Sequence, residues 1–253
     1  MGLGDALIAS GRARKLHQET GLPVLIVGRH NTRYWSDLWD NVPYIIRRPA
    51  GRRYHTLIDG SGVRAYIAGK SAERWTWRPF VPTPAQIVFT PAELAFAEPY
   101  RGMVMVEPNV KAIGHSNKDW GWHNWNSFTL VVNERFQGSI DMLCCSPVPG
   151  PRLSYTRSVL TPTFRHACAV LSVCRAYVGP EGGLHHAAAA VGTPAVILWS
   201  EFISPDITGY ATHRNLRHAG KACGMRTDCR GCRASMEAIT VNEVVENLEG
   251  ILK

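Results

Sequence analysis

Short apolar runs alternate along this sequence with segments whose apolar residues recur at helical spacing. The runs are rich in β-branched residues and predict eight strands, at residues 24–27, 44–46, 65–68, 87–89, 103–106, 140–143, 176–178 and 195–198. Several are apolar on both faces, as is required of strands that helices cover on two sides. The alternation indicates βα units and predicts an α/β fold with mainly parallel sheets.

A boundary between two layered sheets is expected near residues 92–101. Prolines punctuate the stretch before it, from residue 79 to residue 91, and a new strand is expected to open at Gly102. The predicted domains are therefore residues 1–98 and 99–253. The first carries 13 basic and 8 acidic residues and the second 15 and 12, so the first is the more basic for its length.

Capping chemistry predicts two helix starts. Thr161 and Pro162 supply an N-cap and a first-turn proline for a helix that buries Cys168 and Cys174. Near the C-terminus, residues 240–243 form a predicted capping box before a helix with an apolar stripe. Both helices are expected to pack on the sheets.

The segment at residues 176–199 predicts a strand, a tight turn, a short helix and a second strand. Gly182 and Gly183 stand where the first strand meets the helix, so backbone N–H groups there can approach a diphosphate with the helix dipole behind them. Such a site lies at the carboxyl end of a parallel sheet. The alternative is that the glycines only make a turn, and that His185 and His186 are ordinary helix residues, one facing the core and one facing solvent.

Composition narrows the class of protein. A hydrophobic content of 45% with 19% charged residues excludes a disordered chain. No apolar run approaches the roughly 18 residues of a membrane-spanning helix, and the first residues lack the features of a secretory signal, so a cytoplasmic protein is expected. The net charge of +8 and the pI near 9.3 indicate an anionic partner: a nucleotide, a phosphorylated glycan, nucleic acid or an acidic membrane face.

Three segments resemble the family 9 glycosyltransferases, the ADP-heptose:lipopolysaccharide heptosyltransferase group. Residues 181–194 (EGGLHHAAAAVGTP) resemble that family's donor-binding loop and helix. Residues 2–14 (GLGDALIASGRAR) resemble its N-terminal Gly-Asp loop and first helix, and Lys118-Asp-Trp120 resembles its Lys-x-Trp motif. The cysteine-containing tail before the last helix is a further likeness. The segments follow the family's order and cover both predicted domains, but residues 47–85 have no clear counterpart in the family.

The resemblance implies a GT-B fold of two Rossmann-like domains, with the donor held by the C-terminal domain and the acceptor by the N-terminal domain. It implies an inverting transfer in which Asp5 is the catalytic base and the protein supplies the charge for the diphosphate, so no metal or other cofactor is expected. The expected donor is a nucleoside-diphosphate sugar related to ADP-heptose. The resemblance and the predicted topology assign donor binding to Asn109, Lys111, Lys118, Glu181, Gly182, Gly183, Leu184 and His186.

Each assignment has a plainer alternative. Asp5 directly precedes a helical run and, without the resemblance, is interpreted as an N-cap. Lys118 can lie in a solvated loop, with Trp120, Trp122 and Trp125 packed beneath its stem. At position 181 the family usually has an aspartate, where this sequence has a glutamate.

The N-terminal half departs from the family pattern. The sequence begins at the Gly-Asp loop, so the strand expected before it is missing, and 253 residues are few for a two-domain glycosyltransferase. A reduced N-terminal domain is therefore expected. Its basic residues Arg12, Arg47 and Arg48 are assigned to an anionic acceptor such as a lipopolysaccharide-type glycan, at the inner face of the membrane.

Other interpretations of the basic half stay open. Small arginine clusters are most often solvated surface. If they are functional, the chain is alternatively a non-catalytic binder of nucleic acid or another anionic polymer, or a glycosyltransferase that acts on modified nucleic acid. Nucleic acid is the less favoured partner.

Seven cysteines lie between residues 144 and 232, an odd number that favours reduced thiols over a disulfide framework. Cys223, Cys229 and Cys232, with His218 before them, have enough ligands for a structural Cys3His zinc site. Packed or simply reduced thiols are the favoured alternative, because a full site normally shows two tight pairs.

Overall fold

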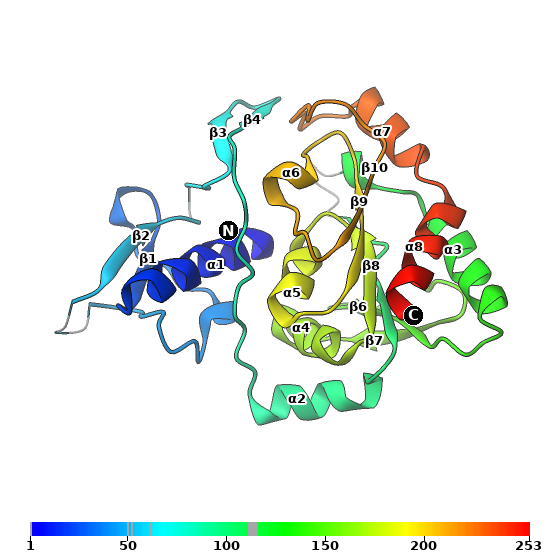
Figure 1. The fold of residues 1–253 in the computed structure, drawn as a ribbon, viewed down its shortest axis with the longest axis horizontal. Coiled ribbons are helices and arrows are strands. Elements are labelled where there is room, and N and C mark those ends of the chain that lie inside the picture. The colour runs from blue at the N-terminus through cyan, green and yellow to red at the C-terminus, as the bar shows by residue number, and fades with distance from the viewer. Residues whose placement is uncertain (1, 50, 52, 61, 111–115) are drawn as a thin grey trace.

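The computed structural model describes residues 2–49, 51, 53–60, 62–110 and 116–253. Its largest part is a six-stranded parallel sheet (Figure 1). The strands are β5 (Val104–Val106), β6 (Met142–Ser146), β7 (Thr156–Leu160), β8 (Ala176–Pro180), β9 (Ala195–Trp199) and β10 (Arg214–Arg217). Their order is β10-β9-β8-β5-β6-β7, so the chain builds outward on one side of β5 and then on the other. The winding reverses between β5 and β8, and doubly wound sheets bind ligands at this switch point.

Helices cover both faces of this sheet (Figure 1). One face carries α3 (Trp122–Arg135) and α8 (Val241–Leu252), and the other carries α4 (Phe164–Val173) and α5 (Gly183–Val191). Because side chains alternate along a strand, Val104 and Val106 pack in the first layer and Met105 in the second. This two-sided burial explains the uninterrupted apolar runs of the central strands.

The N-terminal part packs on the α5 side. Helix α1 (Leu3–Thr20) lies against α5, and β1 (Val24–Val27) pairs in parallel with β2 (His55–Ile58). An antiparallel pair, β3 (Ile67–Lys70) and β4 (Trp75–Trp77), follows. A Cβ on Gly11 would lie 1.9 Å from the backbone oxygen of Thr83, so only glycine lets this segment cross α1 so closely. The reduced N-terminal part is therefore an α-helix with two two-stranded sheets.

Short helices connect these parts. They are α2 (Pro91–Ala97), α6 (Pro205–Thr208), α7 (Arg230–Glu237) and the single turns η1 (Arg29–Asn31), η2 (Asp37–Trp39), η3 (Glu98–Tyr100) and η4 (Ser116–Lys118). The expected boundary near 92–101 falls on α2 and η3, and the division between residues 98 and 99 stays a prediction. Within the described part of the chain, no helix has the length and apolar character needed to cross a membrane.

The α/β class is confirmed, but several predicted elements are wrong. Residues 44–46 and 87–89 form no strand, and Ile45 makes only an isolated bridge to Val24. The run at 65–68 is displaced into an antiparallel hairpin. Strands β2, β4, β7 and β10 were not predicted, because their exposed faces carry polar or charged residues that break the apolar run.

The two predicted helices exist, with corrected ends. Thr163, not Thr161, caps α4, because its hydroxyl accepts the N–H of His166 and the helix begins after Pro162. Thr240 caps α8 as predicted. The carboxylate of Glu243 pairs instead with His218, at 2.8 Å.

Candidate functional site

A cavity of about 710 Å³ lies beyond the carboxyl ends of β5 and β8, at the switch point of the sheet. Its lining comes from segments far apart in the sequence: the start of α1, the β3–β4 hairpin, the loops after β5 and β8, the start of α4 and the loop after β9. Asp5, Asn109, Lys118, Glu181, Gly182, Gly183, Leu184 and His186 all line it. The structure therefore brings together the predicted catalytic residue and every predicted donor-binding residue within its described part; Lys111 lies outside the described residues.

Asp5 is buried at the start of α1 and is held by two hydrogen-bond donors and one ion pair. Its Oδ1 accepts a hydrogen bond from the hydroxyl of Tyr66 at 2.7 Å and forms an ion pair with Nε of Arg64 at 2.6 Å. Its Oδ2 accepts the backbone N–H of Gly2 at 3.3 Å. Asp5 thus lies in the first turn and is not the N-cap, which is Gly2. Burial and the Asp5 charge hold the pKa of Tyr66 well above its usual value, so the phenol stays a donor.

The starts of α1 and α5 approach each other closely beside the cavity. A Cβ on Gly4 would lie 2.8 Å from Cδ2 of His186 and 3.6 Å from Cα of Gly183. The first residues of α4, Thr163 and Phe164, line the same cavity. Three helix N-terminal ends therefore border one space, and each contributes N–H groups and positive dipole potential that favour an anionic ligand.

Lys118 is buried and its ammonium group pairs with the carboxylate of Glu181. The same ammonium lies 4.9 Å from the ring centroid of Phe202. The solvated-loop alternative is therefore wrong, because Lys118 points into the cavity while Trp120 and Trp125 lie in the core. The ammonium group is placed to meet a negative charge inside the cavity.

His185 and His186 are both buried, so the prediction of one solvent-facing histidine is wrong. Burial lowers the pKa of His186 to about 4, which makes it a neutral hydrogen-bonding group at physiological pH. Its Nδ1 lies 3.0 Å from the hydroxyl of Tyr210. Ligand atoms of His185, His186 and Glu181 lie within 4.8 Å of one another, but the Lys118 ammonium on Glu181 opposes a cation there.

Glu107, at the end of β5, is a titratable lining residue that the sequence interpretation did not select. Burial raises its pKa to about 7, although its Oε1 accepts the backbone N–H of Asn109 at 2.7 Å. A carboxyl group that titrates near neutrality inside a cavity is typical of functional sites. Its position after a buried strand was the available signal, but burial itself is not visible in the sequence.

Residues 64–77 supply further lining residues: Arg64 and Tyr66, just before β3, which sequence reasoning missed, and Trp75 and Trp77 on β4. Trp77 packs edge-on against Phe202, with ring centroids 5.3 Å apart. This segment has no counterpart in the family resemblance. Its aromatic residues make an apolar wall beside the charged groups of the cavity.

The arginines assigned to the acceptor lie outside the cavity lining. Arg12 pairs with the buried carboxylate of Asp59 at 2.5 Å. Arg47 is exposed, pairs with Asp40 and stacks over Trp35, and Arg48 is exposed. Their contact with an acceptor stays a prediction.

Comparisons with known proteins find solved structures of similar fold, at low sequence identity. No family model and no curated protein matches the sequence. The ADP-heptose lipopolysaccharide heptosyltransferase II of E. coli is 19% identical over 68% of this chain, with a TM-score of 0.49. This chain covers 55% of that structure and 44% of a second E. coli heptosyltransferase, so it spans about half the length of these proteins.

Two other solved structures align over the whole of this chain. One is TibC, an iron-containing dodecameric glycosyltransferase from enterotoxigenic E. coli H10407, with 14% identity, a TM-score of 0.63 and 76% of its length covered. The other is a family 9 glycosyl transferase from Veillonella parvula DSM 2008, with 9% identity, a TM-score of 0.61 and 94% of its length covered. These likenesses confirm the resemblance at the level of the fold: the chain has the GT-B-type α/β fold of heptosyltransferase-like, family 9 glycosyltransferases.

Proposed function

We propose that this protein is an inverting glycosyltransferase that moves a sugar from a nucleoside-diphosphate sugar to a hydroxyl of an anionic glycan acceptor. The observation that carries the proposal is the convergence of Asp5, Lys118 and the start of α5 on one cavity at the switch point of the sheet. These groups lie far apart in the sequence. If each had only a structural role, nothing would require them to meet at one cavity. The fold and a neighbour solved with ADP-D-β-D-heptose support the choice of donor class.

The diphosphate of the donor has two sources of favourable charge in this cavity. The backbone N–H groups at Gly182 and Gly183 open α5, and the Lys118 ammonium lies in the same lining. As the sugar leaves, negative charge develops on the diphosphate, and preorganised donors stabilise it. In this proposal the protein supplies that charge without a metal ion.

The acceptor hydroxyl needs a base to take its proton while its oxygen attacks the anomeric carbon in line with the leaving diphosphate. Asp5 is the proposed base, and Tyr66 and Arg64 hold its carboxylate toward the cavity. His186, which is neutral and lies beside the start of α1, is suited to form a hydrogen bond with the donor sugar rather than to take the proton of the acceptor hydroxyl. The hairpin tryptophans offer apolar surface to the sugar face or to the nucleobase.

Binding and transfer together test the proposal. Thermal shift and calorimetry with ADP-, UDP- and GDP-sugars are expected to show one preferred donor, since a ligand at 100 times its Kd stabilises by about 2.7 kcal/mol. Transfer is followed as release of nucleoside diphosphate with a lipopolysaccharide core oligosaccharide as acceptor. Asp5→Asn is expected to keep donor binding and to lose about 10²- to 10⁴-fold in rate.

The matched control is Asp141→Asn, because Asp141 is exposed and does not line the cavity. It is expected to leave both binding and rate unchanged. Full transfer by Asp5→Asn removes the proposed base. Binding of nucleic acid with no preference for any sugar nucleotide contradicts the enzyme proposal as a whole.

A further inference from the structure

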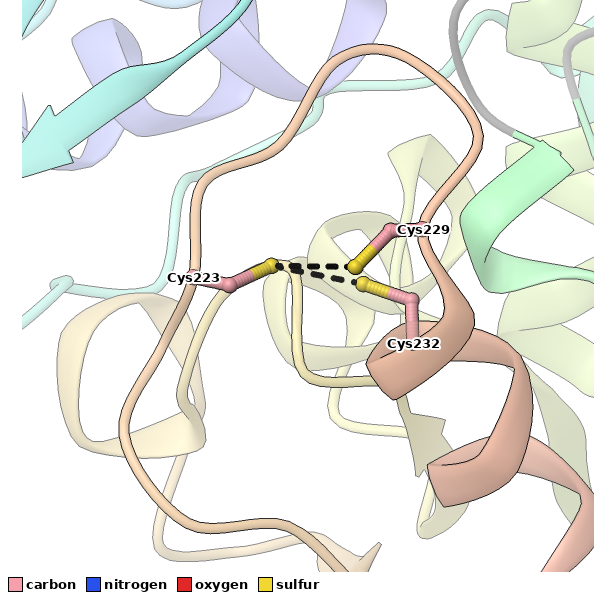
Figure 2. A group of neighbouring side chains, drawn as sticks. All are labelled: Cys223, Cys229 and Cys232. Atoms are coloured by element: carbon pink, nitrogen blue, oxygen red, sulfur yellow. Dashed lines mark hydrogen bonds between the residues drawn. The ribbon is translucent and has the colours of Figure 1, made fainter.

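Three thiols, those of Cys223, Cys229 and Cys232, point toward one another (Figure 2), and none of them lines the sugar-nucleotide cavity. Cys223 lies in the loop after β10, Cys229 is the N-cap of α7, and Cys232 lies in the first turn of that helix. Sγ of Cys223 lies 3.4 Å from Sγ of Cys232 and 4.0 Å from Sγ of Cys229. All three sulfur atoms lie within 4.8 Å of one another, and none is in a disulfide.

These separations match the edges of a metal–thiolate tetrahedron. With metal–sulfur bonds near 2.3 Å, tetrahedral geometry places the sulfur atoms about 3.8 Å apart. A single disulfide would use two of the thiols and leave the third without a partner. A triangle of three sulfur atoms is therefore better explained by one ion that contacts all of them than by a cross-link between two.

We propose that Cys223, Cys229 and Cys232 bind one thiophilic transition-metal ion, of the zinc or iron class. Thiolates are soft ligands that select such ions over magnesium or calcium.

Of the Cys3His ligand set that the sequence offered as the less favoured alternative to packed or reduced thiols, only the three cysteines lie together. His218 is engaged with Glu243 on α8, and it does not belong to the thiol cluster. Among the described residues, no histidine, aspartate or glutamate joins the three cysteines within the same 4.8 Å limit. Three thiolates fix the ion and leave the fourth tetrahedral position to a further ligand such as water.

The loop between the cysteines is tied to the segment before Lys118. The buried Asn117 donates from its Nδ2 to the backbone oxygens of Met225 at 2.9 Å and Thr227 at 2.8 Å. Its Oδ1 accepts the backbone N–H of Cys229 at 3.0 Å. A metal ion that fixes the loop therefore also fixes the residue next to the cavity lysine.

The same loop braces the aromatic wall of the cavity. The backbone N–H groups of Cys223 and Gly224 donate to the oxygens of Glu201 at 2.7 Å and Phe202 at 3.0 Å. The N–H of Trp75 donates to the oxygen of Gly224 at 2.9 Å. Gly224 has a φ of 65°, and a Cβ there would lie 1.9 Å from the oxygen of Trp75. The ion is thus placed to hold the β3–β4 hairpin against the large sheet domain, as a structural site.

Metal content of the purified full chain tests the proposal. Protein expressed with added zinc or with added iron, and analysed by elemental mass spectrometry, is expected to hold about one ion per chain; the two media show which metal is taken. Cys229→Ser and Cys223→Ser are expected to lose at least nine tenths of it. Cys144→Ser, which changes a partly exposed thiol outside the cluster, is expected to keep it.

A second measurement on the unaltered chain guards against variants that fail to fold. Removal of the ion by a chelator under reducing conditions is expected to lower Tm, and addition of Co²⁺ to give the absorption of a tetrahedral thiolate complex. A metal-free chain from both media overturns the proposal, whether its mass shows a Cys223–Cys232 disulfide or three free thiols. Because none of these readouts involves a sugar nucleotide, failure of the proposed activity leaves their outcome unaffected.

Discussion

The hydroxyl of Tyr66 donates a hydrogen bond to the carboxylate of Asp5 at 2.7 Å, across 61 positions of sequence. A donor of this kind fixes the direction of the carboxylate. Tyr66 belongs to the segment before β3, which has no family counterpart, whereas Asp5 belongs to the resembled loop. The finding makes the segment before β3 a component of the candidate site.

Tyr66→Phe is expected to lower kcat about 10- to 100-fold, because the donor that fixes the direction of the Asp5 carboxylate is lost. The Kd for the sugar nucleotide is expected to stay unchanged, since Lys118 and the start of α5 are untouched. Steady-state kinetics measures kcat, and calorimetry measures the Kd. Tyr155→Phe, at an exposed tyrosine, is the control. An unchanged kcat would show that Tyr66 does not act through Asp5.

The ammonium group of Lys118 is predicted to contribute directly to diphosphate binding. Lys118→Met is expected to raise the Kd for the nucleoside diphosphate about 10- to 100-fold, the range for losing a hydrogen bond to a charged group. Lys15→Met, at an exposed surface lysine, should leave the Kd unchanged. Calorimetry measures the Kd of both single variants and of the double variant Lys118→Met/Glu181→Gln. The double variant separates the effect of losing the lysine from the effect of leaving Glu181 without the lysine. Equal affinities for wild type and Lys118→Met would exclude the role.

Donor affinity is predicted to depend on pH through Glu107. Its pKa lies at about 7, raised by burial, so the side chain is mainly neutral at pH 6 and mainly charged at pH 8. The added negative charge opposes an anionic ligand in the same cavity, so affinity is expected to fall as pH rises through 7. A nucleoside-diphosphate sugar is the proper probe, because its bridged phosphates do not titrate in this range. Glu107→Gln should bind equally at pH 6 and pH 8, and a persistent difference would assign the dependence to another group.

The sequence predicted the sheet strands that are buried on both sides and the motif at their carboxyl ends. Residues 103–106, 176–178 and 195–198 fall on β5, β8 and β9, because such strands read as uninterrupted apolar runs. Edge strands such as β7 and β10 have one polar face and give no such signal. The strand predicted at residues 44–46 is wrong for the opposite reason: Tyr44 and Ile45 are apolar and buried, but they do not form a strand.

Part of the candidate site was equally visible, and part was not. Asp5, Lys118 and His186 were found because short motifs carry them. Arg64 and Tyr66 reach the cavity only because the hairpin segment folds back over the start of α1, a long-range contact that has no local pattern. His218, which the sequence offered as a fourth ligand in the less favoured zinc alternative, lies apart from the thiol group for a similar reason. Its position near Cys223 in the sequence does not reveal its pairing with Glu243.

Stability is predicted to depend strongly on the buried pair between Arg165 on α4 and Glu93 on α2. Nε and Nη2 of Arg165 donate to the two carboxylate oxygens at 2.6 and 2.8 Å. Nη1 and Nη2 also donate to the backbone oxygens of Asp37 and Val88. Arg165→Met leaves a buried carboxylate and two buried carbonyl groups without this donor, and is expected to cost about 3–5 kcal/mol in the free energy of unfolding.

The exposed pair of Arg101 and Glu98 has the same two-point geometry, with both distances 2.7 Å, and therefore isolates the effect of burial. Arg101→Met is expected to leave the free energy of unfolding nearly unchanged, because solvent screens an exposed ion pair. Denaturant unfolding at pH 7 measures both variants. Similar costs for the two would mean that Arg165 does not hold α2 and the N-terminal part onto α4.

The buried pair also predicts a pH dependence of stability. Hydrogen bonds from Arg165 lower the pKa of Glu93 from 4.5 to about 2. A carboxyl whose pKa is lowered on folding stabilises the protein above its unfolded pKa, and this stabilisation is lost as pH falls from about 4.5 toward 2. In Arg165→Met the Glu93 contribution to this acid-induced loss should disappear, so the free energy of unfolding falls less steeply with decreasing pH across that window than in the wild type. An equally steep fall in the variant would assign the acid sensitivity to other carboxyl groups and leave the Arg165–Glu93 pair without a measurable share in it.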